Sequence, residues 1–163
     1  MFLIANSRFL LGTSSGPTAV ATTFAVPILW TNMVAFNAFP ASKLDIYIPR
    51  VLRHREGGLL SFEQALQEPL MNLYCWETYQ ELGVELVPNT SEDLVTATIE
   101  MLQRIDGSYQ TTAEDEALHA RFKALTECYE SGAMVGRIGA AYLRKYAHLL
   151  PAEHSTSQAQ VNP

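Results

Sequence analysis

Residues 9–31 read FLLGTSSGPTAVATTFAVPILWT, and this stretch decides the fold class. Arg8 to Gly12 has the composition of a short buried strand, and a tight turn of small residues follows it. Pro17 suits the first position of a helix over residues 18–25, because its missing N–H would have no intrahelical partner there. Residues 27–31 form a second strand, with a proline at its start, where a ladder donor is least needed. We therefore predict a βαβ unit with parallel strands and a right-handed crossover.

The same region raises the alternative of a membrane segment, because no charged side chain occurs between Phe9 and Ser42. A spanning helix needs about 20 predominantly apolar residues, but glycines, prolines and polar residues interrupt every apolar run before that length. A signal peptide is a further alternative, yet its basic residue would be Arg8, which comes late, and its apolar run ends at a Gly/Ser turn. Strands that are covered on both faces also give apolar runs, and we adopt this interpretation.

The composition is that of one globular α/β domain. The chain has 163 residues, of which 48% are hydrophobic and 17% charged, so it can bury a substantial core. The formal net charge of −6 argues against a nucleic-acid-binding surface spread over the domain. Cys75 and Cys128 form no CxxC pair and indicate neither a disulfide framework nor a zinc site. We predict a domain over residues 1–151 and a disordered tail over residues 152–163.

The rest of the sequence predicts short elements followed by long helices. Residues 32–58 look irregular, apart from Ile46 to Ile48, which is expected to be extended. Capping patterns and hydrophobic periodicity mark the later elements. In chain order these are a helix from Ser61 to about Gln67, a helix over Glu77–Leu82 that Gly83 ends, a strand over Val84–Val87, a helix from Thr90 to about Arg104, a helix that begins at Thr112 and breaks at Ser131-Gly132, and a helix over Val135–Leu149 that ends at Pro151.

The turn after the first strand is the main candidate for chemistry. A strand that ends in a small-residue turn and opens a helix directs free N–H groups at one point, and the helix dipole adds positive potential there. Thr13, Ser14 and Ser15 supply hydroxyls, Thr18 flanks the turn, and Gly16 lets a ligand approach the backbone. The pattern matches neither of the two commonest nucleotide-binding fingerprints. Phosphate binding and an ordinary turn whose serines cap the helix are both open.

A second set of candidates follows the βαβ unit. Asp45 is a candidate general base or sugar-hydroxyl ligand, with a solvated or capping carboxylate as the alternative. The histidines show no metal-ligand spacing, and His119 is expected on a helix surface. A local group of cations could attract a diphosphate or an anionic acceptor, with a solvated loop as the alternative. This group consists of Lys43, Arg50, Arg53, His54 and Arg55.

An ordered series of segments resembles the donor-binding half of GT-B glycosyltransferases. The series is more specific than the Ser-Ser-Gly-Pro turn alone. Over about residues 5–150 the chain is similar to a group of bacterial glycosyltransferases that are known mostly from genome sequences. The segments are Phe9 to Pro17, the small-residue helix through residues 21–24, Val26 to Leu29, Thr31-Asn32, residues 40–50, residues 60–62 and residues 81–87.

The resemblance implies a Rossmann-like parallel sheet, the partial C-terminal lobe of a GT-B fold, with C-terminal helices. It implies transfer of a sugar from a nucleotide-diphosphate sugar to a glycan or other acceptor, in cell-surface glycan synthesis, with no metal or other cofactor and no nucleic acid as partner. The donor diphosphate would be bound by Thr13, Ser14, Ser15, Gly16 and Thr18. Candidate substrate contacts are Asn32, Lys43, Asp45 and Arg50, and no catalytic base is assigned.

The resembling enzymes have an N-terminal lobe, and the first part of the C-terminal lobe, ahead of this motif. We therefore expect a truncated product or the C-terminal part of a split enzyme, with the acceptor site and the catalytic base on the missing lobe. The strand at Phe9 to Leu11 would then have an unpaired side that promotes association. The alternative function is a non-catalytic binding or assembly module, or an inactive gene fragment. A cytoplasmic location is expected, with peripheral membrane attachment as the alternative.

Overall fold

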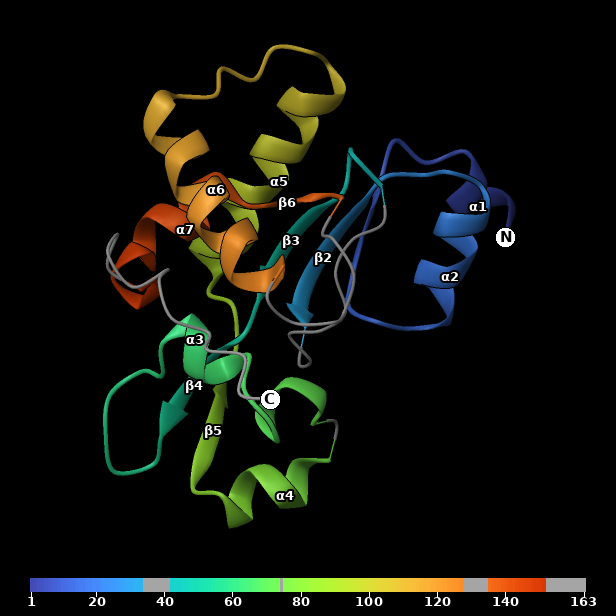
Figure 1. Ribbon diagram of the computed structural model, residues 1–163. Coiled ribbons are helices and arrows are strands. Elements are labelled where there is room, and N and C mark those ends of the chain that lie inside the picture. The colour runs from blue at the N-terminus through green and yellow to red at the C-terminus, as the bar shows by residue number, and fades with distance from the viewer. Residues whose placement is uncertain (34–41, 74, 128–134, 152–163) are drawn as a thin grey trace, which may run out of the picture.

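Figure 1 shows the computed structural model, which describes residues 1–33, 42–73, 75–127 and 135–151. A four-stranded sheet forms its centre, and a two-stranded sheet lies at one end of the molecule. Helices pack around the four-stranded sheet, beginning with the short α1 (Phe2–Ala5) at the N-terminus. The chain is therefore a mixed α/β protein, as the sequence predicts. The predicted tail over residues 152–163 lies outside the described residues.

The four-stranded sheet is parallel throughout. In spatial order its strands are β1 (Leu10–Gly12), β2 (Ile28–Met33), β3 (Ile46–Pro49) and β6 (Arg137–Ile138). The helix α2 (Gly16–Thr23) connects β1 to β2, which confirms the predicted βαβ unit and its parallel strands. Because the strands run in one direction, their carboxyl ends lie along one edge of the sheet, and their amino ends lie along the other.

The strand β1 lies at the side of the sheet. Within the described residues it pairs with β2 alone, so its outer side carries backbone groups that no strand satisfies. Leu11 on this strand is 45% exposed. The expected unpaired side of this strand is thus present in the structure.

The segment after β3 departs from the predicted irregular structure. Arg50 alone separates β3 from β4 (Val51–His54), which pairs antiparallel with β5 (Val84–Val87) in the second sheet. The first two residues of β4 are buried and the last two are exposed, so the sequence has no period-2 alternation that would mark a strand. The short helices α3 (Phe62–Ala65), η1 (Leu70–Asn72) and α4 (Trp76–Glu81) connect β4 to β5.

The long helices α5 (Ser91–Ile105) and α6 (Ala113–Glu127) begin at the predicted caps. Thr90 Oγ1 accepts from the Asp93 N–H at 3.2 Å, and Asp93 Oδ2 accepts from the Thr90 N–H at 2.8 Å. Thr112 and Asp115 form the same reciprocal pair at the start of α6. These pairs satisfy N–H groups that a helix leaves free in its first turn. No helix of the described residues has the length and hydropathy that crossing a bilayer requires.

The predicted helix over Val135–Leu149 is wrong in its first part. The last strand, β6, occupies this place, α7 (Ala140–Lys145) begins after it, and the short η2 (Ala147–Leu149) follows. The Gly139 N–H donates to the Tyr47 carbonyl at 3.0 Å, which continues the ladder between β6 and β3. A Cβ atom on Gly139 would lie 2.9 Å from Ile48 Cγ2, so this close approach requires a glycine. A two-residue strand is too short to leave a period in the sequence.

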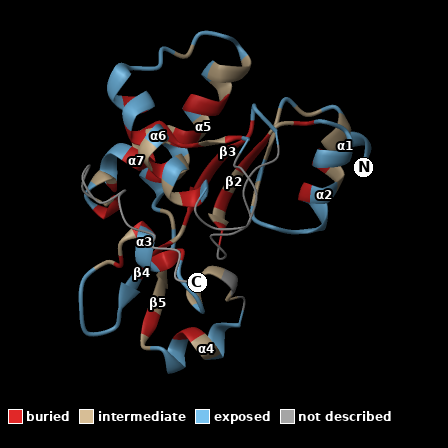
Figure 2. Cartoon of the chain, in the orientation of Figure 1, coloured by how far each residue is buried: buried red, intermediate tan, exposed pale blue. Residues whose placement is uncertain are grey.

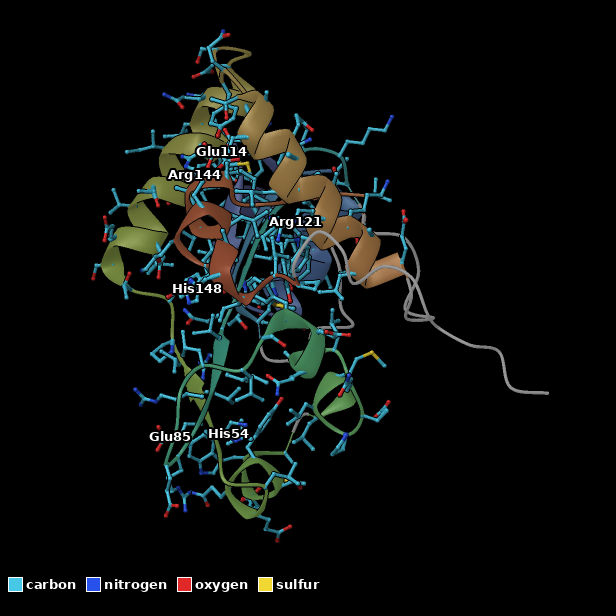
Figure 3. The ribbon with its side chains drawn as sticks, turned by 60° about the vertical axis from the view of Figure 1, so that its left-hand side comes forward. His54, Glu85, Glu114, Arg121, Arg144 and His148 are labelled. Atoms are coloured by element: carbon cyan, nitrogen blue, oxygen red, sulfur yellow. The ribbon has the colours of Figure 1, made fainter. Side chains whose placement is uncertain are left out.

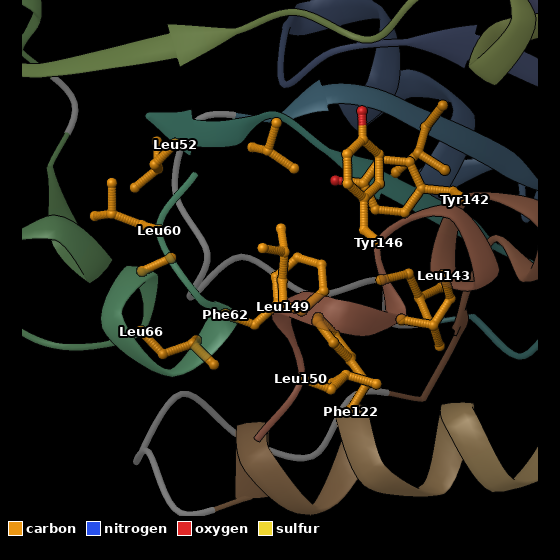
Figure 4. Packing of buried hydrophobic residues seen from close by; sticks show 14 of the residues in the cluster. Leu52, Leu60, Phe62, Leu66, Phe122, Tyr142, Leu143, Tyr146, Leu149 and Leu150 are labelled. Atoms are coloured by element: carbon orange, nitrogen blue, oxygen red, sulfur yellow. The ribbon is translucent and has the colours of Figure 1, made fainter. Parts of the chain in front are cut away.

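One main hydrophobic cluster joins both sheets and the C-terminal helices. Figure 2 colours all buried residues, and many of them lie in β2, β3 and on the helices. Figure 4 shows side chains of α3 and α6 meeting, where the rings of Phe62 and Phe122 pack edge to face at 5.2 Å. A smaller cluster of Ala21, Val26 and Ile28 lies between α2 and the sheet. The two-stranded sheet is therefore part of the same core as the parallel sheet.

The helix α7 is joined to the starts of α5 and α6 by charged groups. Arg144 forms an ion pair with Asp115, and Lys145 forms one with Asp93 at 2.6 Å. Each aspartate is also the side chain that caps its own helix, and both are buried. The Ala140 N–H, in the first turn of α7, donates to the buried Glu100 of α5 at 2.8 Å. Buried carboxylates thus satisfy N–H groups at the starts of all three helices.

The two capping aspartates keep their charge because their hydrogen bonds outweigh burial. Burial alone would raise the pKa of Asp93, but hydrogen bonds from Lys145 and Thr90 bring it below its ordinary value. Burial also opposes ionisation of Asp115, whose pKa is lowered by hydrogen bonds from Thr112 and by Arg144. A carboxyl with a depressed folded-state pKa stabilises the fold above its unfolded pKa, and the stabilisation is lost as the pH falls through the folded pKa.

The sequence predicts that His119 lies on a helix surface. The structure corrects this in part, because His119 is only partly exposed. It is partly buried on α6, and its Nδ1 atom is buried without a hydrogen-bond partner in the described part of the chain. Burial, and then the positive charge of Arg137, lower the pKa of His119 to about 4. Lys123 and Arg104 act in the same direction, and Glu116 opposes them. His119 is therefore neutral in the folded protein over most of the acidic range.

Replacing Lys145 by methionine should leave the buried Asp93 carboxylate without its cation. We expect a loss of about 1–3 kcal/mol in the free energy of unfolding, the usual cost of an unsatisfied buried polar group. Lys123→Met is the matched control, because Lys123 forms an exposed pair with Glu127, and such pairs contribute about 0–1 kcal/mol. Urea denaturation followed by circular dichroism measures both losses. Equal losses in the two variants would contradict the stabilising role of the Asp93–Lys145 pair.

Stability should fall as the pH is lowered from 6.5 towards 4, because the unfolded chain then binds a proton at His119 that the folded chain does not. His119→Leu should flatten this part of the pH dependence. His148→Leu, at an exposed position on η2, should leave it unchanged. Urea midpoints at a series of pH values between 7 and 4 test this. A steep fall that persists in His119→Leu would show that other groups cause it.

Candidate functional site

The turn between β1 and α2 is open to solvent. Thr13, Ser14, Ser15 and Gly16 are exposed, directly after the carboxyl end of β1. Figure 1 shows this turn on the side of the sheet towards which β2 points. The hydroxyls of Thr13 and Ser14 make no hydrogen bond with any described residue. The turn therefore offers free hydroxyls beside the N-terminus of α2, an arrangement suited to an anion.

Thr18 belongs to the turn but is already engaged. Its side chain is buried, and its Oγ1 atom accepts from the Ser15 N–H at 3.0 Å and donates to the Ser15 carbonyl at 2.6 Å. The Thr18 N–H donates to the same carbonyl at 3.2 Å. These bonds fix the first turn of α2. We therefore assign Thr18 to the support of the turn and not to direct contact with a ligand.

The glycines of the turn matter for space and not for backbone freedom. Among the described glycines, positive φ angles occur at Gly83 and Gly107, and not at Gly12 or Gly16. Gly12, at the exit of β1, does not need to be glycine, since a Cβ there would only make ordinary contact with Thr18 Cγ2 at 3.7 Å. A Cβ on Gly16 would meet no atom within 4 Å. Gly16 leaves open space over the turn.

Two asparagines join the carboxyl ends of β2 and β3 to the start of α5. The Asn32 N–H donates to Asn89 Oδ1 at 2.6 Å, and the Asn89 N–H donates to Asn32 Oδ1 at 2.9 Å. Asn89 Nδ2 also donates to the Pro49 carbonyl at 2.7 Å. Asn32 has a φ of 51°, a left-handed value that asparagine tolerates better than most residues. Asn89 is not among the residues predicted from the sequence, although an asparagine just before a helix cap is a signal for side-chain bonding to the backbone.

The group of cations predicted from the sequence does not gather on one surface. Lys43 is exposed ahead of β3, and Arg53 forms an exposed pair with Glu85 at 2.8 Å. Figure 3 shows His54 and Glu85 on the two-stranded sheet, remote from the labelled residues of α6, α7 and η2. Arg50 differs from the others, because it stands at the carboxyl end of β3, where its N–H donates to the Met33 carbonyl at 3.1 Å.

Asp45 lies at the opposite edge of the sheet from the turn. Its carboxylate accepts from the Ile28 N–H at 2.8 Å and from Trp30 Nε1 at 3.2 Å, at the amino ends of β2 and β3. Burial raises the pKa of Asp45, and these hydrogen bonds oppose the increase. At a rise of about 3.3 Å per residue, the four residues of β3 separate the two edges by roughly 13 Å. Asp45 therefore joins strands, and Asp45 and Lys43 are not brought together with the turn.

A pocket of about 220 Å³ lies between α5 and α7, away from the turn. Its wall includes Thr96, Ile99, Gln103, Tyr109 and Arg144. None of these residues belongs to the carboxyl edge, so the pocket does not extend the candidate site. Within the described ranges, no group of three or more His, Cys, Asp and Glu side chains is placed to hold a metal ion.

No protein-family model, curated protein or solved structure matches the chain.

The candidate site consists of the turn at residues 13–16, the cap at Thr18, the Asn32–Asn89 pair and Arg50. The turn and Arg50 follow strands β1 and β3, and the Asn32–Asn89 pair lies at the end of β2. The parallel sheet brings the ends of these strands to one edge.

Two substitutions in the turn should affect the free energy of unfolding differently. Thr18→Val removes the oxygen that accepts from the Ser15 N–H, so we expect a loss of about 1 kcal/mol in the free energy of unfolding. Gly16→Ala introduces a methyl group into open space at an ordinary φ, so it should be neutral or stabilise by up to about 1 kcal/mol. Thermal and urea denaturation measure both effects. A large loss in Gly16→Ala would mean that the turn needs glycine for its fold.

Proposed function

We propose that the protein binds the diphosphate of a nucleotide-diphosphate sugar at the β1–α2 turn, as the donor-binding part of a glycosyltransferase with a Rossmann-like fold. The observation that supports this most directly is the exposed turn, where the hydroxyls of Thr13 and Ser14 bind no described residue and open space lies at Gly16. Ligands of open parallel sheets bind at the carboxyl ends of the strands. The substrate class comes from the resemblance of the ordered segments to GT-B enzymes.

The turn would act on the leaving group. In sugar transfer, the bond between the anomeric carbon and the diphosphate oxygen breaks, and negative charge develops on the diphosphate. The hydroxyls of Thr13 and Ser14 and the positive end of α2 would stabilise that charge. By the resemblance, the acceptor and the catalytic base belong to an N-terminal lobe. We therefore assign no catalytic base among the described residues.

The open side of β1 favours a second candidate function, a binding or assembly module without catalysis. Within the described residues, the outer side of this strand carries unpaired backbone groups, and Leu11 on it is 45% exposed. An unpaired strand edge is a template for pairing with another chain. This function needs no ligand at the turn, so the binding of a nucleoside diphosphate distinguishes the two candidates.

Calorimetric titration of the folded chain with UDP, GDP, ADP and dTDP, in the presence of EDTA, tests the proposed donor site. We expect one of these to bind without added metal and Gly16→Val to abolish the binding, because the valine side chain would fill the space that the phosphate needs.

Gly58→Val is the matched control for this titration. Gly58 also has no atom within 4 Å of a Cβ and an ordinary φ, but it lies between β4 and α3. The Gly58→Val variant should bind the nucleotide as the unmodified chain does. If the folded chain binds none of the four nucleotides, or binds only with Mg²⁺ or Mn²⁺ added, the proposed donor site is wrong.

A further inference from the structure

Arg50 lacks the partner that other arginines of the chain have. Its Nε–H group is buried and donates to no acceptor within the described residues, and its guanidinium forms no ion pair there. The side chain of Arg55, which is exposed, also has no partner among the described residues. The remaining arginines each bind an oxygen, in the pairs Arg8–Asp106, Arg53–Glu85, Arg104–Glu100, Arg121–Pro151, Arg137–Glu116 and Arg144–Asp115.

The difference matters because Arg50 is partly buried. A charged group that is removed from water without a partner costs free energy, and buried polar groups in folded proteins are therefore almost always hydrogen-bonded. An exposed arginine such as Arg55 avoids this cost, because water solvates it. The buried Nε–H of Arg50 is thus a donor whose acceptor comes from outside the described residues.

The backbone of Arg50 is held on both sides. Its own N–H donates to the Met33 carbonyl at 3.1 Å, and the preceding Pro49 carbonyl accepts from Asn89 at 2.7 Å. Asn89 is itself fixed by its reciprocal bonds with Asn32. A side chain whose backbone is fixed in this way loses less freedom when a ligand binds.

We propose that Arg50 is an anion-binding residue at the carboxyl edge of the sheet, which takes an oxyanion of the substrate as its missing partner. A guanidinium presents its N–H groups as a planar fork that fits two oxygens of a phosphoryl or carboxylate group. The Asn32–Asn89 pair positions it and does not itself contact the anion.

The anion can come from two parts of a substrate. Arg50 follows β3 and the turn follows β1, so two strand spacings of about 4.8 Å separate them across the sheet, roughly 10 Å in all. A ligand that is held at the turn must extend past β2 to reach Arg50. The oxyanion is then either a phosphoryl group of the donor or a carboxylate on the transferred sugar or the acceptor.

Anion-dependent thermal stability of the full chain tests the proposal. Sodium pyrophosphate and sodium glucuronate are the probes, and sodium chloride at matched ionic strength is the reference. The variants are Arg50→Gln, Arg50→Lys and the matched control Arg55→Gln. We expect at least one probe to stabilise the unmodified chain and Arg55→Gln, with an apparent Kd that rises about 10- to 100-fold in Arg50→Gln. Arg50→Lys, which keeps the charge and loses the fork, should show a smaller increase.

The stability without added anion gives a second readout. Because Arg50 has no partner to lose, Arg50→Gln should melt at the same temperature as the unmodified chain or above it. If Arg50→Gln is stabilised less by pyrophosphate than the unmodified chain is, the anion comes from the donor phosphate. If Arg50→Gln is stabilised less by glucuronate alone, the anion is a carboxylate. If Arg50→Gln responds to both probes as Arg55→Gln does, or melts lower with an unchanged response, the proposal is overturned.

The role of Arg50 rests on the proposed function only for the source of the anion. The Gly16→Val variant distinguishes failure of the Arg50 role from failure of the proposed donor turn. If Gly16→Val abolishes the response to pyrophosphate and Arg50→Gln retains the full response to both probes, the donor turn stands and the role of Arg50 fails. If Arg50→Gln weakens a response that Gly16→Val leaves intact, the role of Arg50 stands and the assignment of the turn fails.

Discussion

Two adjacent cations at the end of α7 hold together the helices that cover the sheet. Arg144 binds Asp115 at the start of α6, and Lys145 binds Asp93 at the start of α5. At the other end of α7, the buried Glu100 carboxylate of α5 accepts from the Ala140 N–H. Since α7 also follows directly from β6, which pairs with β3, the same few polar contacts fix the helices to the sheet. The carboxylates of Asp93, Asp115 and Glu100 are buried in the low-dielectric interior, so each is costly to leave without its partner.

The two edges of the parallel sheet differ in how their polar groups are used. At the amino edge, the buried Asp45 carboxylate bonds to the Ile28 N–H and the Trp30 ring, so its capacity is taken up inside the molecule. At the carboxyl edge, the hydroxyls of Thr13 and Ser14 and the guanidinium of Arg50 have no partner within the described residues. Polar groups that the fold does not use are the ones available to a ligand, and they lie on the side where parallel sheets bind ligands.

Consecutive residues predict only the turn of the candidate site, whereas Asn32 and Arg50 are predicted from the sequence without the contacts that position them. The turn at residues 13–16 is a local feature, because a strand, small residues and a proline-started helix suffice to form it. The rest depends on residues that are far apart in the sequence. Asn32 and Asn89 are 57 positions apart and meet only because the end of β2 lies beside the start of α5. Asp45 and Arg50 are five residues apart, yet β3 carries them to opposite edges, so nearness in sequence grouped them wrongly.

The sequence by itself determined the βαβ unit, the two capping boxes of α5 and α6 and the mixed α/β class, because each rests on contacts within a few residues. Helix caps and turns form between neighbours, and hydrophobic periods follow from the geometry of single elements. Only the tertiary structure decided that β4 pairs with β5 in a separate sheet, that β6 completes the parallel sheet, and that α7 binds the caps of two other helices. These features join distant segments through backbone pairing and ion pairs, and neither a two-residue strand nor a single charged side chain leaves a periodic signal in the sequence.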